Sequence, residues 1–172
     1  ERIGVFSIGK AAREMARAAV AQMKRKPNFV LIADEGHPLP TRKSLENTNR
    51  MVAKARSLTE RDCAIVLLSG GGSAMFEKPA PGITLEDTIK TTKALLRCGA
   101  TIAEINCVRK HLSAGIGGLF AQLLWPARIF VYGMSDVIGN DLSTIASGPL
   151  SPDPTTFSDA LKVLKKYRVS AP

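Results

Sequence analysis

The sequence predicts an α/β protein built around a mainly parallel sheet, and three observations support this prediction. A fully apolar run from Cys63 to Leu68 breaks directly into three glycines, which is typical of a strand buried on both faces of a parallel sheet. Other short apolar runs alternate with segments of helical periodicity. No internal repeat or low-complexity segment interrupts this alternation. Together they predict a Rossmann-like three-layer sandwich.

Four segments are predicted to be strands, at residues 2–8, 29–33, 63–68 and 129–134. Helices are predicted over about 11–26, 44–58, 84–98 and 156–167, with a further helix starting near Thr101. Thr84 and Thr101 each precede an acidic residue by three positions, the pattern of a capping box at a helix start. In the last helix, Phe157, Leu161 and Leu164 form the predicted buried face.

The loops that follow the predicted strands carry the chemically interesting residues. Because parallel strands all end on one side of a sheet, we expect Gly9-Lys10, residues 34–37, Ser69 to Ser73 and Ser135-Asp136 to gather along one edge. A lysine, a glycine turn and an aspartate at one edge are the groups that phosphoryl transfer requires.

The glycine turn comprises Ser69, Gly70, Gly71, Gly72 and Ser73. Three consecutive glycines remove every Cβ from the turn, so several backbone N–H groups can point into one space and approach a ligand closely. This arrangement suits an anion, and a phosphate above all. The alternative interpretation is a flexible surface turn.

Lys10 and two aspartates are the next candidates. Lys10 follows a strand and opens a helix, so its ammonium can reach the edge where the helix N-terminus already favours anions; the alternative is a solvated lysine. Asp136 ends an apolar strand and Asp141 follows closely, and such oxygen ligands suit Mg²⁺. For Asp141 the alternative is a carboxylate that accepts hydrogen bonds from loop amides.

His37 lies between Gly36 and Pro38, where it could bind substrate, act as a base or only pack the turn. Arg109 and Lys110 could hold an anionic substrate, although a basic cluster on a helix is more often a solvated face. The chain contains neither the glycine fingerprint of dinucleotide-binding proteins nor the Walker loop.

Composition excludes several classes of protein. The 172 residues are 45% hydrophobic and 23% charged, as in an ordinary globular protein of one domain. The net charge of +9 is spread along the chain and aromatic residues are only 5%, which argues against nucleic-acid binding and favours small anionic substrates. With no long apolar run and no leader segment, we expect a cytoplasmic protein that makes no use of a membrane.

Several segments together resemble the amino-terminal domain of the class II glycerate 2-kinases, a family once widely labelled hydroxypyruvate reductase. The matching segments are Ile8-Gly9-Lys10-Ala11-Ala12, Glu35-Gly36-His37-Pro38, residues 68–74, residues 81–85, residues 105–113 and residues 135–149. Their order and their coverage of the chain to about Tyr167 make a chance similarity improbable.

The resemblance implies phosphorylation of D-glycerate at its 2-hydroxyl with ATP and Mg²⁺, in a cleft between this domain and a carboxyl-terminal one. It also implies that Lys10 and Asp136 are catalytic, with Asp136 acting either as base or as magnesium ligand. The amides of Gly70 to Ser73 would then hold an anionic group of substrate or nucleotide. On this interpretation residues 1–172 are a single α/β domain, and the carboxyl-terminal domain is absent from the chain.

The chain also departs from the family pattern. Lys26-Pro27-Asn28 replaces an interval that usually holds an additional strand, and the segment from Ser113 to Leu119 lacks two basic residues of the family motif. Two alternative functions therefore stay open: a hydroxypyruvate reductase, and a non-catalytic domain that binds anions. Since this chain would supply one wall of a two-domain cleft, we expect little kinase activity from it alone.

Overall fold

The computed structural model describes residues 1–135 and 139–171. Its centre is a four-stranded, fully parallel sheet with the strand order β2-β1-β3-β4. The strands are β1 (Ile3–Ile8), β2 (Phe29–Ala33), β3 (Cys63–Leu68) and β4 (Arg128–Gly133). The four predicted strands and the parallel sheet are thus confirmed.

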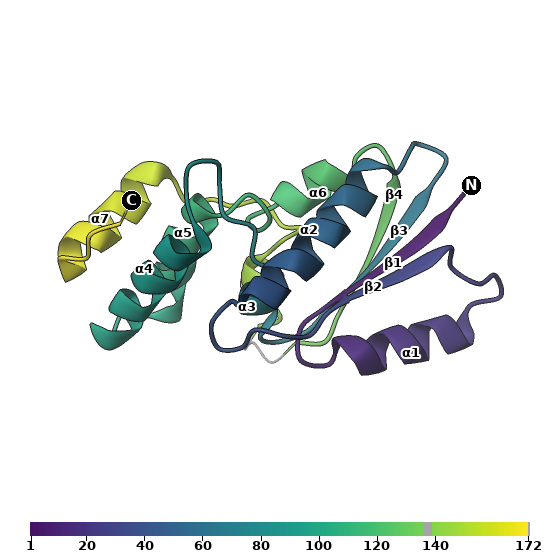
Figure 1. Ribbon diagram of the computed structural model, residues 1–172, viewed down its shortest axis with the longest axis horizontal. Helices are drawn as coiled ribbons and strands as arrows, with labels where there is room; N and C mark the ends of the chain where they lie inside the picture. The colour runs from purple at the N-terminus through teal and green to yellow at the C-terminus, as the bar shows by residue number, and fades with distance from the viewer. Residues whose placement is uncertain (136–138, 172) are drawn as a thin grey trace.

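Helices cover both faces of the sheet. The helix α1 (Ala12–Gln22) lies on one face, and α2 (Arg42–Arg56) and α6 (Leu119–Leu124) lie on the other (Figure 1). Alternate residues of the strands point to opposite faces of the sheet. Val5 and Leu67 pack toward α1, whereas Phe6 and Val66 pack toward α2 and α6. This alternation follows from the two-residue period of a strand and confirms the three-layer sandwich.

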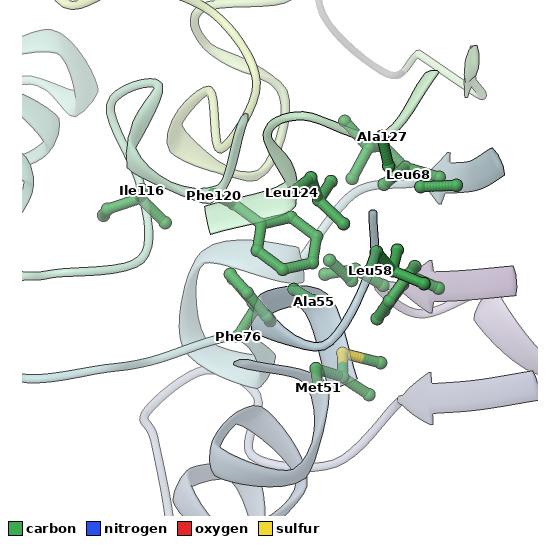
Figure 2. Packing of buried hydrophobic residues seen from close by; sticks show 14 of the residues in the cluster. Met51, Ala55, Leu58, Leu68, Phe76, Ile116, Phe120, Leu124 and Ala127 are labelled. Carbon is green, nitrogen blue, oxygen red and sulfur yellow. The ribbon is translucent and has the colours of Figure 1, made fainter. Parts of the chain in front are cut away.

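Three phenylalanines form the centre of the larger core. Phe120 of α6 meets Phe6 of β1 edge to face at 5.5 Å between ring centroids, and Phe76 lies 4.7 Å from Phe120. Figure 2 shows Phe76 and Phe120 of this core together with Met51 and Leu58. Phe76 directly follows the short helix α3 (Gly72–Met75), so the glycine turn is anchored at both ends, by β3 and by this aromatic cluster.

A second group of helices stands beyond the carboxyl ends of the strands (Figure 1). It contains α4 (Leu85–Arg97), α5 (Ile102–Leu112) and α7 (Phe157–Tyr167), which share a separate apolar core around Leu95 and Val108. The capping boxes predicted at Thr84 and Thr101 are present, and each places a threonine hydroxyl and an acidic side chain on the backbone amides of a helix start.

Three details of the sequence prediction were wrong. The helix α1 ends at Gln22 rather than near residue 26, and α2 begins at Arg42 because Thr41 caps it, with Ser44 completing the capping box. Phe157 and Leu161 do not form the buried face of α7, since both are exposed. The buried side instead consists of Ala160, Val163, Leu164 and Tyr167, which pack on the second core. The helical period identified this helix, but its contact with α5 decides which side is covered.

The prediction that residues 63–68 form a strand buried on both faces is confirmed for β3. In β3 only Cys63 and Ile65 are partly accessible. In β4, by contrast, Phe130 and Tyr132 are exposed, because they face the same side as α1 and that helix packs on β1, β2 and β3. In the described ranges, no helix has the length and apolar character needed to cross a membrane.

Candidate functional site

Hydrogen bonds join the ends of the four strands into one continuous edge. Gly9 N donates to Ala33 O at 2.9 Å, Ser69 N donates to Ile8 O at 2.9 Å, and Met134 N donates to Leu68 O at 2.8 Å. The loops that follow the strands therefore meet, as expected from the parallel arrangement. Asp136, which we predicted at the same edge, lies outside the described residues.

Gly71 lies between Lys10 and His37, which come from different strand ends. Its φ of +80° is a left-handed conformation that favours glycine. A Cβ at this position would stand 3.1 Å from both Cγ and Cε of Lys10 and 2.9 Å from Cδ2 of His37. The absence of a side chain at Gly71 thus lets a cationic side chain and an imidazole both approach the turn closely. Among the described residues, the amides of Gly70 and Gly71 donate to no backbone oxygen.

Gly70, Gly71 and His37 border a cavity of about 500 Å³ between the sheet edge and the helices α4 and α5, whereas Lys10 is not among its lining residues. The sheet side contributes the loop residues His37, Pro38, Gly70, Gly71, Ser73 and Ala74. The helical side contributes Thr92, Leu96, Ile102, Ile105, Asn106 and Arg109, and a third wall is Thr144, Ile145 and Ala146. A cavity thus lies at the carboxyl ends of the strands, where the loops were expected to gather.

Arg109 connects the helical group to the glycine turn. Its Nη2 donates to the backbone carbonyl of Ser73 and, at 3.1 Å, to Oε2 of Glu77. Arg109 is 7% exposed and Glu77 is 1% exposed. Burial raises the pKa of the Glu77 carboxyl, and the Arg109 guanidinium opposes that rise. Arg109 is therefore a buried cation at the cavity wall rather than part of a solvated face.

A small polar network holds the third wall against the turn. The hydroxyl of Ser147 is hydrogen bonded to Ser73 Oγ at 2.7 Å and to Asn106 Oδ1 at 2.9 Å. Ala146 and Ser147 both have left-handed backbones, with φ of 53° and 58°, which is costly for residues other than glycine. Gly117 N supports the segment by donating to Ser147 O at 3.1 Å. The surroundings thus hold a strained segment in place beside the cavity.

Two of the predicted turn residues have supporting roles instead of lining the cavity. Ser69 is buried, and its hydroxyl accepts a hydrogen bond from Ala11 N at 3.1 Å and donates to Ile8 O. Gly72 is packed so closely that a Cβ there would lie 2.6 Å from Cβ of Ala146. Gly70, Gly71 and Ser73 remain the turn residues that face the cavity.

Lys110 and Asp141 lie away from the cavity wall. Lys110 pairs with Asp153 at 3.4 Å. The carboxylate of Asp141 accepts hydrogen bonds from Ser143 N, Ser143 Oγ and Thr144 Oγ1, which lower its pKa. These contacts agree with the alternative of a loop-capping carboxylate. The described ranges contain no cluster of three His, Cys, Asp or Glu residues that could hold a metal ion, and the roles predicted for Asp136 stay predictions.

The sequence analysis missed several residues that line the cavity, most notably Asn106 and Ile102. A signal for them was present, because residues 102, 105, 106 and 109 follow the i, i+3, i+4, i+7 spacing that puts side chains on one face of a helix. Once Arg109 is recognised as a site residue, that spacing identifies the others. Nothing in the local sequence indicated Ser147, whose role depends on a long-range contact.

Comparison with known proteins gives a consistent result. A D-glycerate 2-kinase from Thermotoga maritima is 41% identical over 98% of this chain and 44% of its own length. A glycerate 2-kinase from Pyrococcus horikoshii is also 41% identical, over 98% of this chain and 41% of its own length. A crystal structure of a glycerate kinase from Thermotoga maritima matches with a TM-score of 0.88 at 40% identity, over 100% of this chain and 45% of that one.

The chain thus spans less than half the length of these relatives. A family model described as a domain of unknown function, DUF4147, matches residues 1–172. Because that match covers the sheet, the glycine turn and the helical group alike, the chain belongs to the DUF4147 domain family.

Proposed function

We propose that this chain is the phosphate-holding domain of an enzyme that phosphorylates D-glycerate at its 2-hydroxyl with ATP. The observation that carries the proposal is the position of Gly71 between Lys10 and His37, at a cavity whose opposite wall holds the buried cation Arg109. The similarity to glycerate kinases, near 40% identity over almost the whole chain, supports the same reaction. A cytoplasmic location is part of the proposal.

In this proposal the glycine turn and Lys10 hold the phosphoryl group that is transferred. The amides of Gly70 and Gly71 are donors free of backbone partners among the described residues, so they can receive phosphate oxygens. The exposed ammonium of Lys10 adjoins Gly71, where it can stabilise the negative charge of the transition state. Groups already held in position cost little reorganisation when the reaction occurs.

His37 and Arg109 orient the substrates in this scheme. His37 adjoins Gly71 and lines the cavity, so its imidazole can hydrogen bond to the carboxylate or a hydroxyl of glycerate. Arg109 is held by Ser73 and Glu77, which fixes its charge at the cavity wall. Orienting two reactants in this way lowers the activation free energy of the reaction, by roughly 7–11 kcal/mol in favourable cases.

The residues of the cavity fit a nucleotide better than they fit a metal ion. ATP supplies the phosphoryl group, and the described lining of the cavity offers it amide donors and the guanidinium of Arg109. Neither Asp141 nor Glu77 fits Mg²⁺, since Asp141 accepts hydrogen bonds from Ser143 and Thr144 and Glu77 is paired with Arg109. Asp136 stays a sequence-based candidate for base or magnesium ligand.

The test is a coupled assay of ADP release with D-glycerate, ATP and Mg²⁺, performed on a full-length polypeptide that carries this domain. We expect turnover that depends on D-glycerate and yields 2-phosphoglycerate. The 172-residue chain alone is expected to show negligible turnover, because one wall of a cleft neither aligns two substrates nor excludes water.

A parallel assay of NADH or NADPH consumption with hydroxypyruvate tests the alternative that the protein is a reductase. The turn after β1 lacks the glycine fingerprint of dinucleotide-binding proteins, so we expect no consumption. Consumption of NADH without ADP release would contradict the proposal. No activity of either kind from the full-length polypeptide would favour the non-catalytic anion-binding alternative.

A further inference from the structure

Part of the cavity wall consists of apolar side chains that a three-carbon acid does not need. Leu96 and Ile102 line the cavity although they are 53% and 66% exposed, and the buried side chains of Ile105 and Ile145 continue the wall. D-Glycerate carries oxygen on every carbon, so contact with such a wall gains it little. The wall indicates a second ligand group that is apolar and benefits from being covered.

The size of the cavity leads to the same conclusion. Its volume of about 500 Å³ lies in the range of pockets that bury a drug-sized molecule, roughly 300–1,000 Å³. A ligand with a handful of heavy atoms would leave most of this space to water. A nucleotide is of the appropriate size.

The face of α5 that lines the cavity changes in character along its length. Ile102 and Ile105 come first, Asn106 follows, and Arg109 lies at the end that contacts the glycine turn through Ser73. At a rise of 1.5 Å per residue, the distance along the helix axis from Ile102 to Arg109 is about 10 Å. This is comparable to the separation between the base and the phosphates of an extended nucleotide.

The charge of the cavity fits the same orientation. Its described lining contains a cation, Arg109, but no carboxylate. The nearby carboxylate of Glu77 is paired with that arginine. Phosphates are therefore favoured at the Arg109 end and an uncharged group at the Ile102 end.

We propose that this cavity holds the nucleoside end of the phosphoryl donor, a nucleoside di- or triphosphate. The flat base lies against Leu96 and Ile102, and the phosphates point toward Gly71 and Arg109. Glycerate then occupies the side of the turn next to Lys10 and His37. The inference rests on the proposed function for the identity of the donor, but it concerns only where the nucleoside binds.

The experiment is calorimetric titration of the 172-residue chain, in the presence of Mg²⁺, with ADP and separately with inorganic pyrophosphate, which lacks the nucleoside. We expect ADP to bind at least about tenfold more tightly than pyrophosphate, because only ADP covers the apolar wall. The variants Leu96→Asn and Ile102→Asn are each expected to weaken ADP binding about fivefold and to leave pyrophosphate binding unchanged. Both side chains are more than half exposed, so the fold should tolerate the substitutions.

The matched control is Leu161→Asn on α7, which is 65% exposed and lies outside this cavity. It should change neither affinity, and circular dichroism should show the same helix content for all variants. Equal affinity for ADP and pyrophosphate would overturn the inference while leaving phosphate binding at the turn intact. Tighter ADP binding that is insensitive to both variants would also overturn it. The apolar wall would then contact something other than the nucleoside, such as the part of the longer relatives that this chain does not span. Binding of neither probe would contradict the proposed function as well.

Discussion

Arg109 on α5 donates a hydrogen bond to the backbone carbonyl of Ser73, 36 residues earlier in the chain, in the glycine turn. The same guanidinium holds the buried carboxylate of Glu77. The side chain of Arg109 therefore joins the helical group to the turn and compensates the buried negative charge of Glu77.

Substitution of Arg109 tests how much this buried ion pair contributes to stability. Arg109→Met should lower the free energy of unfolding by about 3–5 kcal/mol, because it leaves Glu77 as an uncompensated buried charge. The double variant with Glu77→Leu removes both charges and should recover much of that loss. Urea denaturation measures both values. A loss under about 1 kcal/mol for Arg109→Met would mean that Glu77 is easily neutralised or hydrated.

The glycine turn can be tested with a pair of alanine substitutions. Gly71→Ala and Gly99→Ala both place alanine at a positive φ, +80° and +72°, so each should cost about 1–2 kcal/mol in stability. A Cβ at Gly99 meets nothing within 4 Å, whereas a Cβ at Gly71 collides with Lys10 and His37. Phosphate affinity, measured by calorimetry, should therefore fall about tenfold for Gly71→Ala and remain unchanged for Gly99→Ala. If Gly71→Ala and Gly99→Ala bound phosphate with equal affinity, the anion would have to bind somewhere other than the glycine turn.

Lys10 is expected to act on the reaction and not on the fold. In a full-length polypeptide that carries this domain, Lys10→Ala should reduce turnover by about 10²-fold or more, as when a preorganised charge at the transition state is removed. The melting temperature should be unchanged because the side chain is exposed. Lys24→Ala, at an exposed lysine just beyond α1, is the control. Unchanged turnover in Lys10→Ala would make Lys10 a surface residue.

Acid stability should depend on Glu104, which links the start of α5 to α7. Lys166 first, and then the Thr101 amide and the Tyr167 hydroxyl, lower the pKa of Glu104 from 4.5 to about 2. A carboxyl with a lowered pKa contributes stability above its unfolded pKa and loses that contribution as the pH falls through its folded pKa. The stability difference between wild type and Glu104→Gln should thus be constant above about pH 5 and vanish near pH 2.

Denaturation in urea at a series of pH values measures this difference. In a Lys166→Met background, which removes the largest cause of the shift, the same comparison should give a smaller difference. A difference that does not vary with pH would show that the substitution acts through shape and not through charge.

The architecture was predictable because it depends on local periodicity. The apolar run at 63–68 and the capping threonines Thr84 and Thr101 specify their elements without help from distant residues. The exposed side of β4 and the buried side of α7 were not predictable in this way. Whether Phe130 or Phe157 is covered depends on which helix packs there, and a two- or 3.6-residue period cannot supply that information.

The site followed the same rule. Lys10, His37 and Gly71 were identified because each lies in a loop that follows an apolar strand, and parallel topology brings such loops together. The burial of Arg109 was missed because its partners, Ser73 and Glu77, are far from it in sequence. Sequence patterns therefore indicated which edge of the sheet is functional, whereas tertiary contacts decide which side chains face the cavity.

The central claim is that the glycine turn between Lys10 and His37 binds a phosphate group. The most direct measurement is a titration of the nitrogen-labelled 172-residue chain with 2-phosphoglycerate, followed in its amide NMR spectrum. We predict saturable shifts centred on the amides of Gly70, Gly71 and Ser73, weakened by Lys10→Ala and absent from the exposed glycine Gly82. Saturation without movement of the Gly70 and Gly71 amides, or identical titrations of the wild type and Lys10→Ala, would contradict the claim.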